Sequence, residues 1–301
     1  MDINYELYKV FYHVAVSLSF SEASKKLYIS QSAVSQSIKV LEQKLNQPLF
    51  IRSMKKVQLT PEGEILLRHV EPAMNLIRRG EAQIMEAHAL GGGQLRMGAS
   101  DTICRYFLVP YLNRFHREYP GVHIKVTNRT SIKCVDLLES GSVDLIFTNY
   151  PNSRLGHGLH IRHIRKFHDC FIASRKYYGE LEQKTLSLKE LLEYPILMLG
   201  RNSTTSEFVH SMFQQHQLDL VPEIELSSND LLLDLASIGL GIAFVPDFCV
   251  TQKLEELFPI QLESTLPERL LSIVHKEQLP LSNAARQFMD YFPEVPLPRN
   301  P

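Results

Sequence analysis

The sequence of 301 residues contains no long uninterrupted run of apolar residues. A helix that crosses a membrane needs roughly 18–20 such residues, so no membrane span is predicted. The first residues, MDINYELYK, also lack the basic stretch and the apolar segment of an export signal. Hydrophobic residues make up 44% of the chain and charged residues 22%, which is typical of a folded protein, and the length suffices for two or more domains. We therefore expect a cytoplasmic protein with more than one domain.

Cysteine is scarce, with four residues spread over the chain and no C-x-x-C pair among them. A disulfide framework or a zinc site usually needs closely spaced cysteines, often with histidines. We expect reduced and mostly buried thiols, with redox sensing by a cysteine pair as the less favoured alternative. The cysteines are Cys104, Cys134, Cys170 and Cys249.

Motifs of common enzyme sites are also missing. The chain contains no G-x-S-x-G, H-E-x-x-H or G-x-x-x-x-G-K-[ST], and the pair Gly239 and Gly241 lacks the third glycine of a dinucleotide site. Twelve histidines are present, but the group between His157 and His168 is not joined by a set of cysteine and acidic ligands at the spacing of a metal site. We therefore predict no catalysis and no metal or other cofactor, and we assign these histidines to the surface or to packing.

Residues 20–45 are predicted to form two helices joined by a tight turn. The segment from Ser21 to Tyr28 opens on a serine that can cap free N–H groups, and it continues through good helix formers. Ile29 and Ser30 then break the pattern. A second helix follows, because apolar residues recur at spacings of four, three and four on one face. These residues are Val34, Ile38, Leu41 and Leu45.

The first turns of the second helix carry short hydroxyl and amide side chains. Such side chains can donate and accept hydrogen bonds at base edges and phosphates when a helix enters the major groove of DNA. An ordinary amphipathic helical hairpin is the plainer alternative. We predict that DNA bases are read by Gln31, Ser32, Ser35 and Gln36, and that phosphates are held by Lys39, Arg52, Lys55 and Lys56.

The neighbouring segments favour the DNA-binding interpretation. A helix predicted from Tyr5 to Ser17 has apolar residues on one face and can complete a three-helix core. After the helix pair, two short β-prone runs at 49–51 and 57–59 flank a basic tip. Residues 1–60 hold eight Lys and Arg against four Asp and Glu, a net charge of +4, so the remainder carries −5. We predict a winged helix-turn-helix domain over residues 1–60, with positive charge where phosphates would lie.

A long helix is predicted to start at Thr60 and Pro61 and to run to about Leu90. A single domain would leave this rod with nothing to pack on, whereas a protein that grips two DNA half-sites needs such a helix for pairing with its own copy. The apolar residues expected to contact their symmetry mates are Leu66, Val70, Ala73 and Ile77.

Two features interrupt or end this helix. Pro72 lacks the N–H that a helix interior uses, so we predict a kink or break near residues 70–72. Gly91, Gly92 and Gly93 have no side chain to pack and mark the clearest boundary of the chain, so we predict a hinge there. Residues 61–93 are therefore predicted to be a linker and dimerisation helix followed by a hinge.

Beyond the hinge, short apolar runs alternate with helical patterns, which favours a parallel sheet covered by helices. We predict two α/β lobes over residues 94–301, like a periplasmic binding protein, with the last strand and helix returning to the first lobe. The predicted strands are 94–99, 123–128, 144–148, 169–174, 196–199, 223–227, 242–245 and 270–275. The predicted helices are 102–119, 131–140, 188–193, 206–216, 230–238 and 282–291.

The sequence resembles the LysR-type transcriptional regulators. The resemblance is carried by FSEAS at 20–24, LYISQSAVS at 27–35, PLF at 48–50 and LTPEG at 59–63, and more weakly by GLGIAFVP at 239–246. Gln36 stands where this family often has arginine, and Asn46 where it usually has glycine, although Asn tolerates the left-handed conformation of a helix end. The resemblance implies a DNA-binding regulator that acts as a dimer or tetramer and responds to a small molecule.

Candidate effector residues follow from the rule that ligands lie at the C-terminal ends of strands, next to helix starts that attract anions. Each such residue could instead be a plain helix cap. The resemblance places four of them, Ser100, Thr102, Thr130 and Thr204, near positions that line the effector cleft of the family. Predicted effector-binding residues are Ser100, Thr102, Thr130, Asn149, Ser203, Thr204 and Thr205, and Arg105, Arg129, Arg201 and His168 are candidates for neutralising an anionic ligand.

A small-molecule binding protein or enzyme, with a helical head for protein contacts, is the alternative. A transported binding protein would need an export signal, and a protein-binding head would not need a net positive charge beside a polar recognition helix. The sequence therefore favours a ligand-responsive regulator of transcription.

Overall fold

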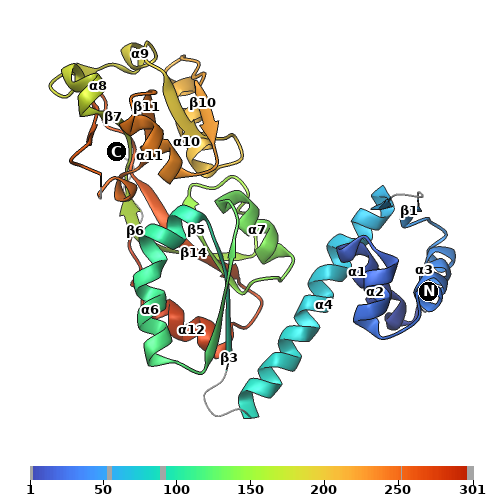
Figure 1. Cartoon of the computed structure of the whole chain (residues 1–301). Helices are drawn as coiled ribbons and strands as arrows, with labels where there is room; N and C mark the ends of the chain where they lie inside the picture. The colour runs from blue at the N-terminus through green and yellow to red at the C-terminus, as the bar shows by residue number, and fades with distance from the viewer. Residues whose placement is uncertain (1–2, 53–55, 89–92, 252, 297–301) are drawn as a thin grey trace. The chain divides into compact units, whose positions relative to one another are not determined.

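The structure is a computed structural model that describes residues 3–52, 56–88, 93–251 and 253–296. The chain divides into two compact units, with the main boundary after His88. Figure 1 shows the helical N-terminal unit in blue and the α/β unit in colours from green to red. In the described part of the chain, no helix combines the length and the apolar character that a membrane span requires.

Three helices and a hairpin form the head of the N-terminal unit. They are α1 (Tyr5–Ser17), α2 (Phe20–Leu27), α3 (Gln31–Leu45), β1 (Phe50–Arg52) and β2 (Val57–Leu59). The strands β1 and β2 pair in antiparallel fashion, and the helices enclose a core that includes Phe11, Val34 and Ile38. The winged helix-turn-helix architecture is thereby confirmed.

The caps of the head helices explain where each begins and ends. Ser19, rather than the predicted Ser21, caps α2, because its hydroxyl accepts a hydrogen bond from the N–H of Glu22 at 3.2 Å. The helix consequently begins at Phe20. Asn46 ends α3 in the left-handed conformation, with a φ of 52°, as expected for an asparagine that replaces a terminal glycine.

The long helix α4 (Pro61–His88) begins at the predicted cap, where the Thr60 hydroxyl accepts from the N–H of Gly63 at 3.0 Å. Of the predicted kink or break, the break is wrong, because the helix runs through Pro72 without interruption. Val70 and Met74, on either side of the proline, pack on the core of the head, and this packing offsets the hydrogen bond that proline cannot make. Ile77 and Ile84, further along, are 57% and 65% exposed.

The first lobe of the second unit is built on a five-stranded sheet of order β4-β3-β5-β14-β6. Its helices enclose a core rich in phenylalanine, including Phe115, Phe147 and Phe288. The strands are β3 (Gly93–Ala99), β4 (Val122–Asn128), β5 (Leu145–Tyr150), β6 (Leu159–Phe167) and β14 (Arg269–Lys276), and the helices are α5 (Asp101–Ile103), the π-helical turn η1 (Cys104–Leu108), α6 (Val109–Glu118), α7 (Ser131–Glu139) and α12 (Asn283–Met289).

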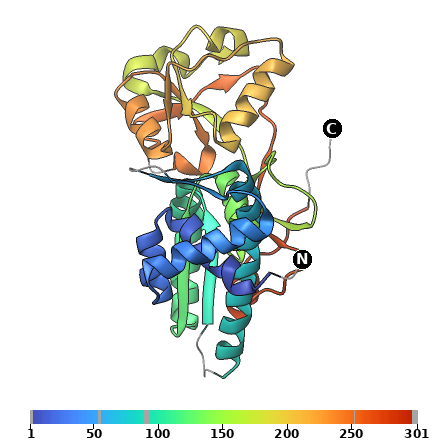
Figure 2. The same cartoon turned by 90° about the vertical axis from the view of Figure 1, so that its right-hand side faces the viewer.

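The second lobe has its own five-stranded sheet, of order β10-β9-β11-β7-β12. The strands are β7 (Asp169–Ser174), β9 (Ile196–Leu199), β10 (Ile224–Leu226), β11 (Ile242–Pro246) and β12 (Leu257–Pro259), with a separate pair β8 (Thr185–Leu186) and β13 (Gln261–Leu262). The helices are α8 (Arg175–Tyr178), α9 (Leu188–Leu191), α10 (Thr204–Gln215) and α11 (Asn229–Ser237), with 3-10 turns η2 (Gly179–Leu181) and η3 (Asp247–Cys249). Both views show the lobes as separate bodies (Figures 1 and 2).

The two-lobed α/β architecture is confirmed, but the predicted parallel sheet is wrong in part, because each five-stranded sheet is mixed. β3 is parallel to β4 and β5, whereas β14 is antiparallel to β5 and β6, and β7 is antiparallel to β11 and β12. β7 and β14, which run against their neighbours, are the strands that begin just after the chain crosses from one lobe to the other. Gly93 lies in β3, while Gly91 and Gly92 of the predicted hinge lie outside the described residues.

Candidate functional site

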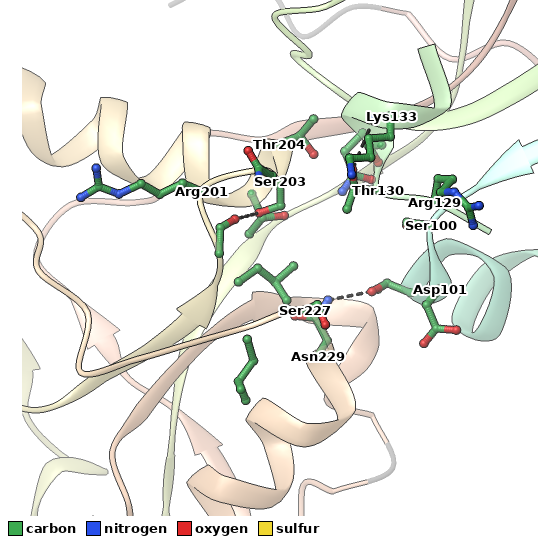
Figure 3. Close-up of a pocket in the computed structure, with 18 of the residues that line it drawn as sticks. Ser100, Asp101, Arg129, Thr130, Lys133, Arg201, Ser203, Thr204, Ser227 and Asn229 are labelled. Atoms are coloured by element: carbon green, nitrogen blue, oxygen red, sulfur yellow. Dashed lines mark hydrogen bonds between the residues drawn. The ribbon is translucent and has the colours of Figure 1, made fainter. Parts of the chain in front are cut away.

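A cavity of about 860 Å³ lies between the two lobes of the second unit. It is lined from the first lobe by residues around the starts of α5 and α7, and from the second lobe by residues around the starts of α10 and α11. Figure 3 shows Thr130 and Lys133 of the first lobe on one side and Arg201 and Ser203 of the second lobe on the other. The size is that of a site for a small molecule.

The structure brings all seven predicted effector residues to this one cavity. They are Ser100, Thr102, Thr130, Asn149, Ser203, Thr204 and Thr205. Other polar or charged residues also line it and were not among the predicted effector residues, including Asp101, Lys133, Glu225, Ser227 and Asn229. Of the candidate cations, Arg129 and Arg201 line the cavity, whereas Arg105 and His168 are not among the lining residues.

Several lining hydroxyls are also helix caps, so the plainer interpretation applies to them, and their role in effector binding stays a prediction. The Ser100 hydroxyl accepts from the N–H of Ile103 at 3.3 Å, and the Thr130 hydroxyl accepts from the N–H of Lys133 at 3.3 Å. Ser203 caps α10 by accepting from the N–H of Ser206 at 3.1 Å, and it donates to the carbonyl of Gly200 at 3.0 Å. The hydroxyl of Ser203 therefore already has one hydrogen-bond donor and one acceptor as partners.

Helix α10 points free donors at the cavity. Ser203 satisfies the N–H groups of Ser206 and Glu207, but the N–H groups of Thr204 and Thr205 have no partner among the described residues. Helix α7 repeats the arrangement, because Thr130 satisfies the N–H groups of Lys133 and Cys134 and leaves the two preceding ones free. Unpaired N–H groups at helix starts attract anions.

The charged residues of the cavity are more basic than acidic. Arg129, Lys133 and Arg201 face two carboxylates, Asp101 and Glu225. Arg201 and Glu225 lie 4.0 Å apart and partly offset each other within the second lobe. The first lobe therefore contributes two cations and one carboxylate, so its wall carries an excess of positive charge.

Among the contacts that connect the lobes beside the cavity are two hydrogen bonds to the first turn of α11. The side-chain amide of Asn229 donates to the Thr102 hydroxyl at 2.8 Å, the bond drawn as a dashed line from Asn229 in Figure 3. The Tyr106 hydroxyl, in the π-helical turn, donates to the carboxylate of Asp230. Burial and the hydrogen bond to Asp230 raise the pKa of Tyr106, so this phenol stays protonated near neutral pH.

Behind the cavity, a buried ion pair joins the two places where the chain crosses between lobes. Arg269 at the start of β14 and Asp169 at the start of β7 approach to 2.7 Å, and both are almost completely buried. Arg269 also donates to the hydroxyl of Thr205 at 3.3 Å, and its guanidinium lies against the rings of Phe167 and Phe208. The pair therefore touches a residue that lines the cavity.

The cysteines are all free thiols, two buried and two partly buried. Burial raises the pKa of Cys104 to about 11, and it raises the pKa of both Cys134 and Cys170 to about 12. A thiol reacts with oxidants as the thiolate, and burial disfavours the thiolate form of these three residues. Within the described ranges, no group of three or more His, Cys, Asp or Glu side chains is placed to hold a metal ion.

The predicted DNA-reading residues share one side of α3. Val34, Ile38 and Leu41 are buried in the core of the head, while Gln31, Ser32, Gln36 and Lys39 are exposed and Ser35 is partly buried. In the hairpin, Arg52 ends β1 and Lys56 is exposed, while Lys55 lies outside the described residues. The residue roles at DNA remain predictions.

The comparisons with known proteins cover both units. Residues 5–64 match the family described as bacterial regulatory helix-turn-helix protein, lysR family, and residues 88–296 match the LysR substrate binding domain. The HTH-type transcriptional activator CmpR from Synechocystis sp. is 28% identical over 94% of this chain and 93% of its own length. A probable RuBisCO transcriptional regulator from Gracilaria tenuistipitata var. liui is 29% identical over 90% of this chain and 89% of its own.

Two solved structures share the fold. A full-length OxyR variant from Pseudomonas aeruginosa superposes with a TM-score of 0.72 at 19% identity, covering 96% of this chain and 94% of that one. Full-length CbnR complexed with its target DNA superposes with a TM-score of 0.66 at 20% identity, covering 96% and 99%. Since the two family matches together span nearly the whole sequence, the chain belongs to the LysR family of DNA-binding transcriptional regulators.

Proposed function

We propose that this regulator senses a small anionic metabolite in the cavity between its lobes. The observation that carries the proposal is the convergence of free helix N–H groups with Arg129, Lys133 and Arg201 around one cavity. Unpaired donors and helix dipoles favour negative charge without a buried protein cation. A ligand that binds one arrangement of the lobes better than another shifts the protein toward that arrangement, which is how it would alter DNA binding.

The test of the ligand class is a thermal-shift screen of anionic and neutral metabolites, followed by calorimetry on the best ligand. We expect Lys133→Met to weaken its binding about threefold to tenfold, because one charge-assisted contact is lost at a partly solvated site. Lys184→Met, which removes an exposed lysine that does not line the cavity, is the matched control. An apolar best ligand, or equal binding by wild type and Lys133→Met, would contradict the proposal.

We further propose that α4 pairs with its copy in a dimer. Leu66 and Val70, predicted for this contact, pack on the head instead, so the contact would use Ala73, Ile77 and Ile84, which are exposed. Ile77→Asp should raise the dimer dissociation constant at least tenfold, since a charge would enter an apolar contact. The control Arg68→Gln lowers the net charge by the same amount on the opposite side of the helix. It should leave the dimer dissociation constant unchanged. Sedimentation of both variants checks this expectation.

Sequence reading by α3, with phosphates held by Lys39 and the hairpin, completes the proposal. The alternative is a helical head that binds proteins while the cavity does the main work. A gel shift with the DNA just upstream of the chain's own gene separates the two. Retardation that weakens with salt is expected for phosphate contacts, whereas no retardation of any intergenic fragment at low salt would favour the protein-binding head.

A further inference from the structure

We propose that Asn229 sets the hydrogen-bond polarity of the cavity and thereby selects oxyanions that carry no hydrogen of their own. Such groups are carboxylates, sulfate and fully ionised phosphoryl groups. The inference rests on the proposed anionic ligand and adds which protonation state of that ligand is accepted. Asn229 acts through Thr102 and is therefore a positioning residue.

A hydrogen bond between the lobes fixes the orientation of the Thr102 hydroxyl. Asn229 is the first residue of α11 and only 3% exposed, and its side-chain nitrogen donates to the Thr102 oxygen at 2.8 Å. An amide NH₂ group is only a donor, so the threonine hydroxyl must be the acceptor. Its own hydrogen remains free, and no acceptor in the described part of the chain receives it. Thr102 lines the cavity, so this hydrogen is available to a ligand.

Three other lining hydroxyls are constrained in the same way. Ser100 and Thr130 accept from backbone N–H groups, and Thr205 accepts from the guanidinium of Arg269. None of these three hydroxyls donates its hydrogen to an acceptor among the described residues. Together with Thr102 they present four O–H donors to the cavity. With the free N–H groups of α7 and α10, these four hydroxyls form a group of donors in a cavity whose carboxylates are those of Asp101 and Glu225.

The choice of asparagine at position 229 is informative. Its Oδ1 atom is buried without a partner, which is unfavourable for an amide oxygen. Aspartate would suit the start of a helix at least as well, because its charge is stabilised by the helix dipole. An aspartate, however, would accept the hydrogen of the Thr102 hydroxyl. The Thr102 oxygen would then face the ligand as an acceptor. Asparagine keeps that hydrogen free for the ligand.

The consequence is selection by protonation state. A ligand oxygen without hydrogen accepts from these donors, whereas a P–OH or COOH group would place a hydrogen against another donor and lose a bond. A phosphate monoester loses its second proton near pH 6. Methyl phosphate should therefore bind better at pH 8 than at pH 5, while sulfate keeps its charge over this range and reports changes in the protein itself.

The experiment is a double-mutant cycle on the full chain, with wild type, Asn229→Asp, Thr102→Val and the double variant. Calorimetry with sulfate, methyl phosphate and acetate measures each affinity, and it distinguishes tetrahedral from carboxylate oxyanions. Asn229→Asp should weaken the best probe about 10- to 100-fold in the wild-type background, because a hydrogen bond to a charged group is replaced by opposed acceptors. In the Thr102→Val background the loss should be clearly smaller.

The cycle also separates polarity from charge. Repulsion between the new carboxylate and the anion acts through space, so it would lower affinity by the same factor in both backgrounds, and that result would overturn the role of Asn229. If wild type binds none of the three probes at millimolar concentration, the anionic ligand itself is refuted. If wild type binds and the cycle shows no coupling, only the inference about Asn229 fails.

A second variant keeps the test independent of how well aspartate is tolerated. Asn229→Ala removes the amide donor and lets the Thr102 hydroxyl turn either way. The ratio of methyl phosphate affinity at pH 8 to that at pH 5, corrected by sulfate, should be smaller in Asn229→Ala than in wild type. An unchanged ratio would contradict the inference, since general loosening of the lobes weakens both protonation states alike.

Discussion

Arg269→Met is expected to destabilise the second unit by about 3–5 kcal/mol, the effect of removing one partner from a buried ion pair. The side chain of Asp169 is 0% exposed, and the substitution removes its partner at 2.7 Å. Methionine fills much of the space between Phe167 and Phe208, so the loss reflects the unpaired charge rather than a large cavity. Urea unfolding followed by circular dichroism measures the change.

Two further variants show whether burial is responsible. Arg154 and Asp136 form an exposed pair at the same 2.7 Å distance, with side chains 50% and 56% exposed, so Arg154→Met should cost below about 1 kcal/mol. Combining Arg269→Met with Asp169→Leu removes both buried charges and should recover most of the stability. Similar losses in the free energy of unfolding for Arg269→Met and Arg154→Met would show that the buried pair stabilises the fold no more than the exposed pair.

Gln36→Ala is expected to weaken binding to the cognate DNA site by about 1–3 kcal/mol and to change binding to random DNA little. Gln36 is exposed in the second turn of α3, on the side opposite the buried Val34, Ile38 and Leu41. A glutamine amide can make two hydrogen bonds to adenine in the major groove, and both are lost with alanine. Fluorescence anisotropy with matched cognate and random duplexes measures both affinities.

Lys39→Ala provides the comparison from the same helix. A lysine that contacts phosphate contributes to all sequences alike, so this variant should weaken both complexes and reduce the salt dependence by about one unit of slope. The two variants should therefore differ in the ratio of cognate to random affinity. If Gln36→Ala lowers both affinities equally, base reading does not depend on this residue.

The head could be predicted closely from sequence because its signals are local. Tyr5–Ser17 was predicted and observed with the same bounds, and the stripe Val34, Ile38, Leu41 is the buried face of α3. The sheet was harder, because strand direction depends on partners far away in the chain. β6 was not delimited, since its histidines and arginines obscure the alternation and its pairing with β14 is shifted by an irregularity between Leu271 and Ser272.

The candidate site was found in part by one rule, polar residues where strands end and helices begin. The same rule applied after β10 would also have pointed to Ser227 and Asn229, which line the cavity. It could not have identified Arg269, whose partner Asp169 is 100 residues away and whose role depends on burial. The break predicted near Pro72 is wrong for a related reason, because α4 continues through the proline while Val70 and Met74 pack on the core of the head.

The π-helical turn η1 bears on how related sequences should be aligned. A π-helical turn holds one residue more than an α-helical turn, and this extra residue lets Tyr106 face the second lobe while its neighbour Phe107 stays in the core of the first. Loss of one residue between Cys104 and Leu108 would rotate the preceding turn by about 100° relative to α6. A one-residue gap at this point in a relative therefore signals a chain whose lobes are joined differently, even if the surrounding residues are identical.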